Sequence, residues 1–235
     1  MTPSLVLLPG MDGTGDMFRP LLDAFGGTLS SVVVSYPSTE PLRYSELVAL
    51  ARESLPTNGP YVLLGESFSG PIAVTLAAEH PDGLTGLILC ASFVSNPIPW
   101  LRPLRMLSGF FPIQSALRLF GPGWLFGRSE TPELRRLFFE AAKRVSTPVL
   151  RTRIREVLNV DVSLLVGSVD VPVMYIQATE DRLLTQAVAD RFLRAAPRAT
   201  LMRLAAAHGV LQCVPQEAAR MIAEFLRVVS QVSNG

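Results

Sequence analysis

Short apolar runs rich in β-branched residues alternate along the chain with longer segments in which apolar residues recur at helical spacing. The short runs are apolar on both faces, which is typical of strands buried within a parallel sheet. Helical segments separate most of them, and this order predicts an α/β fold, a mostly parallel sheet of about six strands with helices on both faces. We expect strands at 4–10, 31–37, 61–67, 84–92, 171–179 and 199–207, and helices at about 16–26, 44–55, 68–80, 185–196 and 214–230.

The alternation breaks once, in a long segment at 93–169 that contains no convincing strand. An α/β sheet binds ligands beyond the carboxyl ends of its strands, so an insertion between strands predicts a helical cap over that edge. Helices packed against the side of the sheet are the alternative. We predict one domain, with an α/β core at 1–92 and 170–235 and the cap at 93–169. The helical stretches expected in the cap are 113–120, 132–145, 147–158 and 161–167.

The composition is that of a compact, enzyme-sized domain. The 235 residues are 49% hydrophobic and 17% charged, without repeats or low-complexity tracts. No apolar run reaches the roughly 18 residues of a membrane-spanning helix, and the opening MTPSLVLLPG lacks the basic start of a signal peptide. Cys90 and Cys213 have no disulfide-framework spacing. We therefore expect reduced, buried thiols in a cytoplasmic protein.

Charge is distributed unevenly. The segment 93–161 carries 11 basic and 5 acidic residues, whereas the remainder carries 10 and 15. A basic cap could steer an acidic carrier protein, an anionic substrate or an anionic membrane surface toward the site, and solvated arginines beside apolar helices are the alternative. The net charge of +1 and the lack of RNP, zinc or P-loop patterns argue against nucleic-acid binding. The arginines expected to contact an acidic partner are Arg102, Arg105, Arg118 and Arg128.

The segment GESFSG, residues 65–70, holds two serines, either of which could be a nucleophile. It ends the strand YVLLGES and opens the helix FSGPIAVTLAAEH, an arrangement that presents a serine at the top of a sheet. The residue two places before the nucleophile must be small, because strand and helix backbones nearly touch there. Gly65 meets this need for Ser67, whereas Ser69 would have Ser67 in that place. The pattern favours Ser67, and a glycine turn without chemistry is the alternative.

A nucleophilic serine needs a base that takes its proton, and the chain has two histidines. His80 ends the helix that Ser67 opens, roughly 20 Å away at the helical rise of about 1.5 Å per residue, and is out of reach. His208 follows the last strand, at the edge of the sheet where Ser67 also lies. We therefore predict His208 as the base.

The histidine needs a carboxylate that fixes its tautomer. In VPVMYIQATEDRLLT the strand ends near Ala178, which places Glu180 and Asp181 in the loop at the same edge. We predict Asp181 as the partner of His208, with Glu180 as its rival. Asp170 precedes the strand and falls at the opposite edge.

An oxyanion hole requires backbone N–H groups directed at the substrate carbonyl oxygen. The residue after the nucleophile, Phe68, offers one at the start of a helix. The glycine-rich LLPGMDGTG after the first strand offers another, and Met11 is the predicted donor. This stretch does not match a phosphate-binding loop, because it lacks both the Lys-Ser/Thr ending and the G-x-G-x-x-G spacing.

Three motifs in this order, LLPGMDG, GESFSG with ATEDRLL, and AAHG, resemble the α/β-hydrolase superfamily over essentially the whole chain. The resemblance implies Ser67 as nucleophile, Asp181 as acid, His208 as base, and Met11 with Phe68 as oxyanion donors.

Two residues depart from the pattern of that superfamily. Pro9 stands where many members have a histidine, and Ser69 stands in place of the second glycine of the elbow. Neither change removes a catalytic group. The first strands of larger members are also absent.

The resemblance implies acyl transfer. The many large apolar residues of the cap favour a substrate with an acyl chain, although packing of these residues on one another would account for most of them. The size, cap position and arginine-rich cap look like the small carboxylesterases that include pimeloyl-ACP methyl ester esterases of biotin synthesis, whose cap arginines engage the carrier protein. LPGMDGTG is also similar to loops in plant-type acyltransferases. The predicted pocket or cap residues are Trp100, Phe110, Phe111, Phe120 and Trp124.

We therefore predict a serine carboxylic ester hydrolase for an apolar acyl ester, with a carrier-linked methyl ester as one form of substrate. A thioesterase or an acyltransferase on the same residues is the alternative, and a non-catalytic ligand sensor is the alternative of another class. No cofactor is expected. Metal-dependent hydrolysis is disfavoured because the two histidines fall on opposite sides of the fold, and dehalogenase chemistry because the elbow holds serine instead of aspartate.

Overall fold

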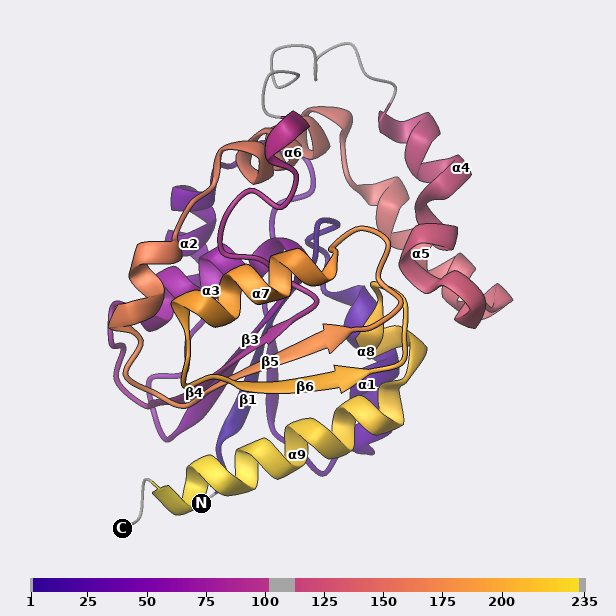
Figure 1. The fold of residues 1–235 in the computed structure, drawn as a ribbon. Helices are drawn as coiled ribbons and strands as arrows, with labels where there is room; N and C mark the ends of the chain where they lie inside the picture. The colour runs from indigo at the N-terminus through magenta and orange to yellow at the C-terminus, as the bar shows by residue number, and fades with distance from the viewer. Residues whose placement is uncertain (1, 102–112, 233–235) are drawn as a thin grey trace.

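Six parallel strands form a single sheet in the order β2-β1-β3-β4-β5-β6, in a computed structural model that describes residues 2–101 and 113–232 (Figure 1). The predicted α/β fold with a parallel sheet is thus confirmed. All strands run in one direction, so their carboxyl ends share one edge of the sheet. The strands are β1 (Ser4–Leu8), β2 (Ser31–Val33), β3 (Tyr61–Glu66), β4 (Leu84–Cys90), β5 (Val173–Ala178) and β6 (Thr200–Leu204).

Helices cover both faces of the sheet (Figure 1). In β1, Leu5 and Leu7 join the apolar core on one face, while Val6 and Leu8 join the core on the other. This alternation explains why the strand is apolar throughout. One face is covered by α1 (Arg19–Phe25), α8 (Val210–Cys213) and α9 (Pro215–Val232), and the other by α2 (Tyr44–Glu53), α3 (Gly70–Ala77) and α7 (Gln186–Ala195).

Three helices between β4 and β5 lie beyond the sheet (Figure 1), and we refer to them as the inserted helices. They are α4 (Ile113–Phe126), α5 (Pro132–Arg144) and α6 (Thr147–Asn159). The short 3-10 helix η5 (Ser163–Ser168) follows them and contacts α3 and α7 of the sheet layer. The segment expected as a helix at 161–167 is therefore a 3-10 helix packed against the core.

Helix α4 is longer than the expected stretch at 113–120. Pro122 has no N–H for the helical ladder and normally ends a helix. Here tertiary packing outweighs that cost, because Phe126 is fully buried and Gly121 lies against the ring of Phe138, where a Cβ would come within 2.5 Å. The helix continues to Phe126 for this reason.

The edge strand β2 is shorter than the predicted 31–37. After Val33 the chain turns toward the loop that follows β1, and the Tyr36 N–H donates to the Gly13 carbonyl at 2.7 Å. Both cysteines are free thiols, as expected, although only Cys90 is fully buried. Within the described part of the chain, no helix has the length and apolarity needed to cross a membrane.

Candidate active site

The turn after β3 holds Ser67 in a left-handed conformation, with φ of 48°. A non-glycine residue in that region is strained and persists only where its surroundings enforce it. Gly65 supplies the necessary space, since a Cβ there would lie 2.8 Å from the Cβ of Ala73. The hydroxyl of Ser92 donates to the Ser67 carbonyl, which fixes the turn. The sequence GESFSG thus folds as the sharp strand-to-helix turn expected of a nucleophile elbow.

The structure brings Ser67, His208 and Asp181 together at the carboxyl edge of the sheet. Ser67 Oγ lies 2.8 Å from His208 Nε2, and His208 Nδ1 lies 2.7 Å from Asp181 Oδ2. The side chains of His208 and Asp181 are only 6% and 3% exposed. His80 instead pairs with the exposed Asp170, 3.0 Å away.

Asp181 is held by its own loop. Its Oδ1 accepts hydrogen bonds from the N–H groups of Leu183 and Leu184, at 2.7 and 2.9 Å, which leaves Oδ2 for the histidine. Burial acts to lower the pKa of His208, but the charge and hydrogen bond of Asp181 outweigh it and raise that pKa above its usual value. The rival carboxylate, Glu180, is exposed. The arrangement can therefore orient the imidazole and stabilise its protonated form.

The two predicted oxyanion donors come from two different segments of the chain. Phe68 lies in the first turn of η2 (Ser67–Ser69), where helix N–H groups have no intrahelical acceptor. Its carbonyl accepts from the Tyr44 hydroxyl at 2.9 Å, and its ring stacks on that of Tyr44. Met11 lies in the loop after β1 and lines a cavity together with Ser67.

Ser69, which replaces the second glycine of the elbow, is completely buried. Its hydroxyl donates to the Pro9 carbonyl and lies 2.8 Å from the hydroxyl of Tyr36. Ser69 therefore joins the elbow to the loop after β1. The sequence showed only that Ser69 stands in place of a glycine, and it did not predict this role.

A cavity of about 410 Å³ lies beside Ser67 and His208. Its walls are apolar and come largely from the inserted helices, a composition typical of sites for apolar small molecules. The apolar side chains of the inserted helices that line it are Trp124, Leu125, Phe138, Ala141, Ala142, Leu150, Ile154, Val157 and Leu158, and Val145, between α5 and α6, lines it as well.

Of the aromatic residues predicted for the pocket, Trp124 lines it. Phe120 lies one turn earlier on α4 and stacks on Trp124, with ring centroids 5.4 Å apart. It is 52% exposed and does not line the cavity. Trp100 is 75% exposed and does not line the cavity, because it lies on the outside of the molecule. Phe110 and Phe111 lie outside the described residues.

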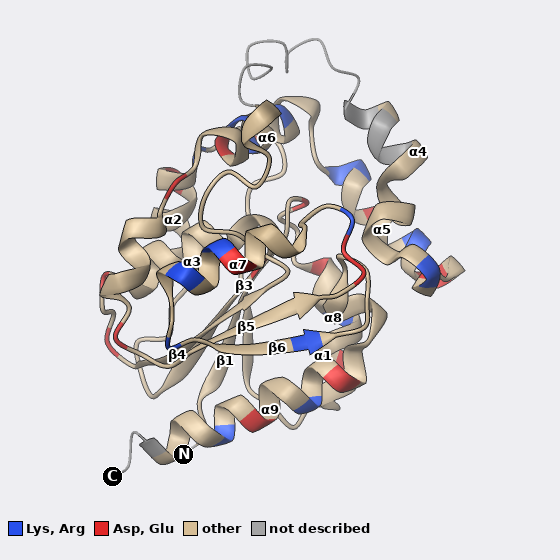
Figure 2. Cartoon of the chain, viewed as in Figure 1, with Lys and Arg blue, Asp and Glu red and all other residues tan. Residues whose placement is uncertain are grey.

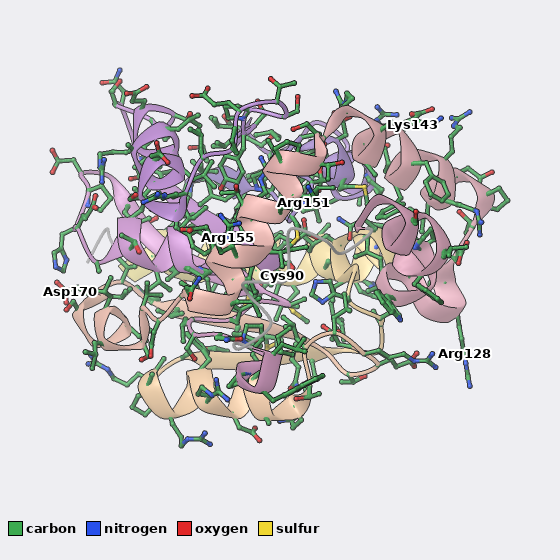
Figure 3. All side chains as sticks on the ribbon, turned by 90° about the horizontal axis from the view of Figure 1, so that it is seen from above. Cys90, Arg128, Lys143, Arg151, Arg155 and Asp170 are labelled. Carbon is green, nitrogen blue, oxygen red and sulfur yellow. The ribbon has the colours of Figure 1, made fainter. Side chains whose placement is uncertain are left out.

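The arginines predicted to contact an acidic partner are placed only in part. Arg102 and Arg105 lie outside the described residues, as does the side chain of Arg118 on α4. Arg128 is exposed and extends away from the body of the molecule (Figure 3). Basic residues occur along α5 and α6 (Figure 2). In the described chain, no group of three or more His, Cys, Asp and Glu side chains is arranged to hold a metal ion.

The strand order, the serine turn and the cavity beside it can be compared with known proteins. The sequence model of the alpha/beta hydrolase family matches residues 5–225. The chain belongs to this family. The resemblance drawn from its three motifs is confirmed at this level, while the narrower likeness to pimeloyl-ACP methyl ester esterases remains a prediction.

Solved structures of the same fold include the enol-lactonase from Burkholderia xenovorans LB400, with a TM-score of 0.81 and 17% identity over 97% of this chain and 92% of that one. An esterase from Exiguobacterium antarcticum has a TM-score of 0.81 and 14% identity, over 96% and 92% of the two chains. Phytyl ester synthase 1, chloroplastic, from Arabidopsis thaliana is 31% identical over 111 residues. That match covers 43% of this chain and 16% of the synthase.

Glu66 is a cavity residue that the sequence analysis missed. It lies directly before Ser67 and is 7% exposed, and its Oε1 accepts from Gln212 Nε2 at 3.0 Å. Burial raises the pKa of Glu66 to about 7, against the opposing effect of the Gln212 hydrogen bond. The signal in the sequence was a carboxylate at the end of an otherwise apolar strand, which is expensive to bury in its charged form.

Replacing Glu66 with glutamine should remove a pH-dependent loss of stability. Because the folded-state pKa is raised, the wild type loses stability as pH rises from about 4.5, and the loss is complete above about 7. Glutamine keeps the acceptor for Gln212 and does not ionise. We therefore expect the free energy of unfolding in urea, taken as variant minus wild type, to be roughly 2–3 kcal/mol larger at pH 8 than at pH 4.5.

The exposed carboxyl of Glu53 provides the matched control. Glu53→Gln should change the free energy of unfolding by the same small amount at both pH values. An equal effect of Glu66→Gln at both pH values would show that burial does not perturb Glu66.

Proposed function

We propose that this alpha/beta hydrolase is a serine carboxylesterase that acts through an acyl-enzyme on Ser67. His208 Nε2 takes the Ser67 proton as Oγ attacks the ester carbonyl, and then gives it to the oxygen of the leaving alcohol. Water next loses a proton to His208 and attacks the acyl carbon, which releases the acid and returns the proton to Oγ. The hydrogen-bonded series Ser67, His208 and Asp181 beside an apolar cavity is the observation that carries this proposal.

The oxyanion formed in each step requires donors close to Ser67. We assign this role to the N–H groups of Met11 and Phe68, because Phe68 follows the nucleophile at the start of η2 and Met11 lines the same cavity as Ser67. Such donors stabilise charge that develops only in the transition state, and losing one typically costs about 10²- to 10³-fold in kcat.

We further propose that the acyl group is apolar and uncharged. Among the residues that line the cavity, the ionisable side chains other than His208 are Asp12 and Glu66, both acidic. An acyl chain with a terminal carboxylate would find no Lys or Arg among the described residues of this wall and would lose its hydration. An alkyl chain would instead bury its surface against the inserted helices, at about 25 cal/mol per Å².

A matched ester series tests this function. For p-nitrophenyl esters from acetyl to dodecanoyl, kcat/KM should rise with chain length until the cavity is filled. The kcat/KM of an ester whose acyl chain ends in a carboxylate should be at least about tenfold lower than that of the alkyl ester of equal length. The corresponding alkyl thioester, assayed in parallel, separates the esterase from the thioesterase. Tight binding of the acid product without turnover of any ester would instead identify a ligand sensor.

An alcohol acceptor is the second candidate, because the relative with 31% identity is a phytyl ester synthase. The same acyl-enzyme would then pass its acyl group to an alcohol instead of water. Adding a long-chain alcohol to an ester assay should yield the new ester if this candidate is correct. Free acid as the sole product over a range of alcohol concentrations would exclude it.

A further inference from the structure

Arg153 lies on the inserted helix α6 and is 1% exposed, the largest side chain among the fully buried residues. Within the described structure, its guanidinium donates to three backbone carbonyl oxygens. Nη1 donates to the carbonyls of Met11 and Asp12, both at 2.8 Å, and Nη2 donates to the carbonyl of Pro37 at 3.1 Å. Two of these acceptors belong to the loop that carries the proposed oxyanion donor.

The loop is shaped to receive this side chain. Gly13 has φ of +70°, and a Cβ there would lie 2.5 Å from Arg153 Nη1, so only glycine allows so close an approach. The guanidinium also faces the rings of Tyr36 and Phe68, with centroids 5.8 and 5.9 Å away. Arg153 therefore touches both the loop after β1 and the residue that follows Ser67.

Burial lowers the pKa of the Arg153 guanidinium, and the negative charge of Asp12 opposes that shift. Among the described residues, no carboxylate lies within salt-bridge distance of Arg153. Burying a charge without a direct salt bridge is costly, and here three carbonyl acceptors, two aromatic faces and the nearby charge of Asp12 offset that cost. A site assembled at such a cost indicates a role beyond packing.

We infer that Arg153 is a positioning residue that holds the loop after β1, residues 9–13, in its active geometry. We call this segment the oxyanion loop, and through Arg153 its geometry depends on the placement of α6. Arg153 holds the carbonyls of Met11 and Asp12, while Ser69 holds the carbonyl of Pro9 on the other side. The peptide that carries the Met11 N–H is thus anchored from both directions. The inference rests on the proposed function, in which that N–H binds the oxyanion.

Arg153→Met removes the three hydrogen bonds while keeping much of the apolar volume. We expect kcat for a p-nitrophenyl ester to fall about 10- to 100-fold, with KM changed less than about threefold, because the loss falls on the transition state. Rates are expressed per active site titrated with a fluorophosphonate, which corrects for unfolded protein. An alkyl trifluoromethyl ketone, whose adduct oxygen occupies the oxyanion hole, should bind more weakly by a similar factor.

Arg155 provides the matched control, because it is an exposed arginine on the same helix (Figure 3). Arg155→Met should keep kcat within about twofold of the wild type. Arg153→Lys, which retains one charged donor, should give an intermediate kcat, and guanidinium ion should partly restore Arg153→Ala. A kcat per titrated site within twofold of the wild type in Arg153→Met would overturn the inference, as would an equal loss in Arg155→Met.

Amide hydrogen exchange of residues 10–13 separates this inference from the proposed function. If the wild type hydrolyses no ester, the proposed function fails, and the exchange data still test the positioning role. Faster exchange in Arg153→Met than in Arg155→Met supports that role. Equal exchange in the two variants overturns it.

Discussion

Replacing Ser67 with alanine is expected to lower ester turnover by about 10⁴- to 10⁶-fold, because no other group takes the place of Oγ beside His208. The residual rate should come from the oxyanion hole and substrate binding alone. The fold should be retained, since alanine relinquishes only the hydrogen bond to His208 Nε2. The measurement is kcat for the best p-nitrophenyl ester of the series, with folding checked by circular dichroism.

Ser69 is the matched control, since it is the second serine of the same turn. Ser69→Ala removes the bonds to the Pro9 carbonyl and the Tyr36 hydroxyl, which loosens the oxyanion loop without touching the nucleophile. We expect a loss of no more than about tenfold in kcat. Loss of activity in Ser69→Ala with full activity in Ser67→Ala would reverse the assignment of the two serines.

Asp181→Asn is expected to lower kcat by about 10³- to 10⁴-fold, an effect of the size seen when a triad aspartate is replaced. The geometry of the loop gives the reason. Oδ1 accepts from the N–H groups of Leu183 and Leu184, so the asparagine oxygen will take that place. Its NH₂ group then faces His208 Nδ1 and donates to it. The imidazole must carry its proton on Nε2, where it can no longer accept the proton of Ser67.

The pH profile distinguishes this electrostatic role from a structural one. Asp181 raises the pKa of His208, so the wild type gains activity as pH rises through that raised pKa. In Asp181→Asn the acid limb of kcat/KM should shift to lower pH. Glu180→Gln, the neighbouring exposed carboxyl, should change neither the rate nor the profile. An unshifted acid limb in Asp181→Asn would contradict the assignment.

The sequence could place Ser67, Asp181 and His208 because each follows a strand of a parallel sheet. The carboxyl ends of such strands meet at one edge, so knowing where each strand ends suffices to bring the three residues together. The same logic placed Asp170 at the opposite edge, and the length of the helix after Ser67 placed His80 out of reach; the two residues pair with each other. Strand periodicity therefore carried most of the information about these residues.

Arg153 could not be identified in this way. Its contact with Met11 joins residues 142 positions apart, and it depends on how α6 is oriented over the sheet. In the sequence it was one of 11 basic residues in a segment with no pattern that fixes such an orientation. The positions of Phe120 and Trp100 also depend on how the inserted segment is placed over the sheet, which the sequence does not fix. Both were expected in the pocket, and both are exposed.

Covalent labelling can show whether Ser67 is the nucleophile. The wild type would be treated with an alkyl fluorophosphonate, digested and analysed by mass spectrometry. We expect a single phosphonyl group on Ser67, formed at a rate that falls sharply in Asp181→Asn, and no labelling of Ser67→Ala. A label on any other residue, or a wild type that hydrolyses esters and remains unlabelled, would contradict this assignment.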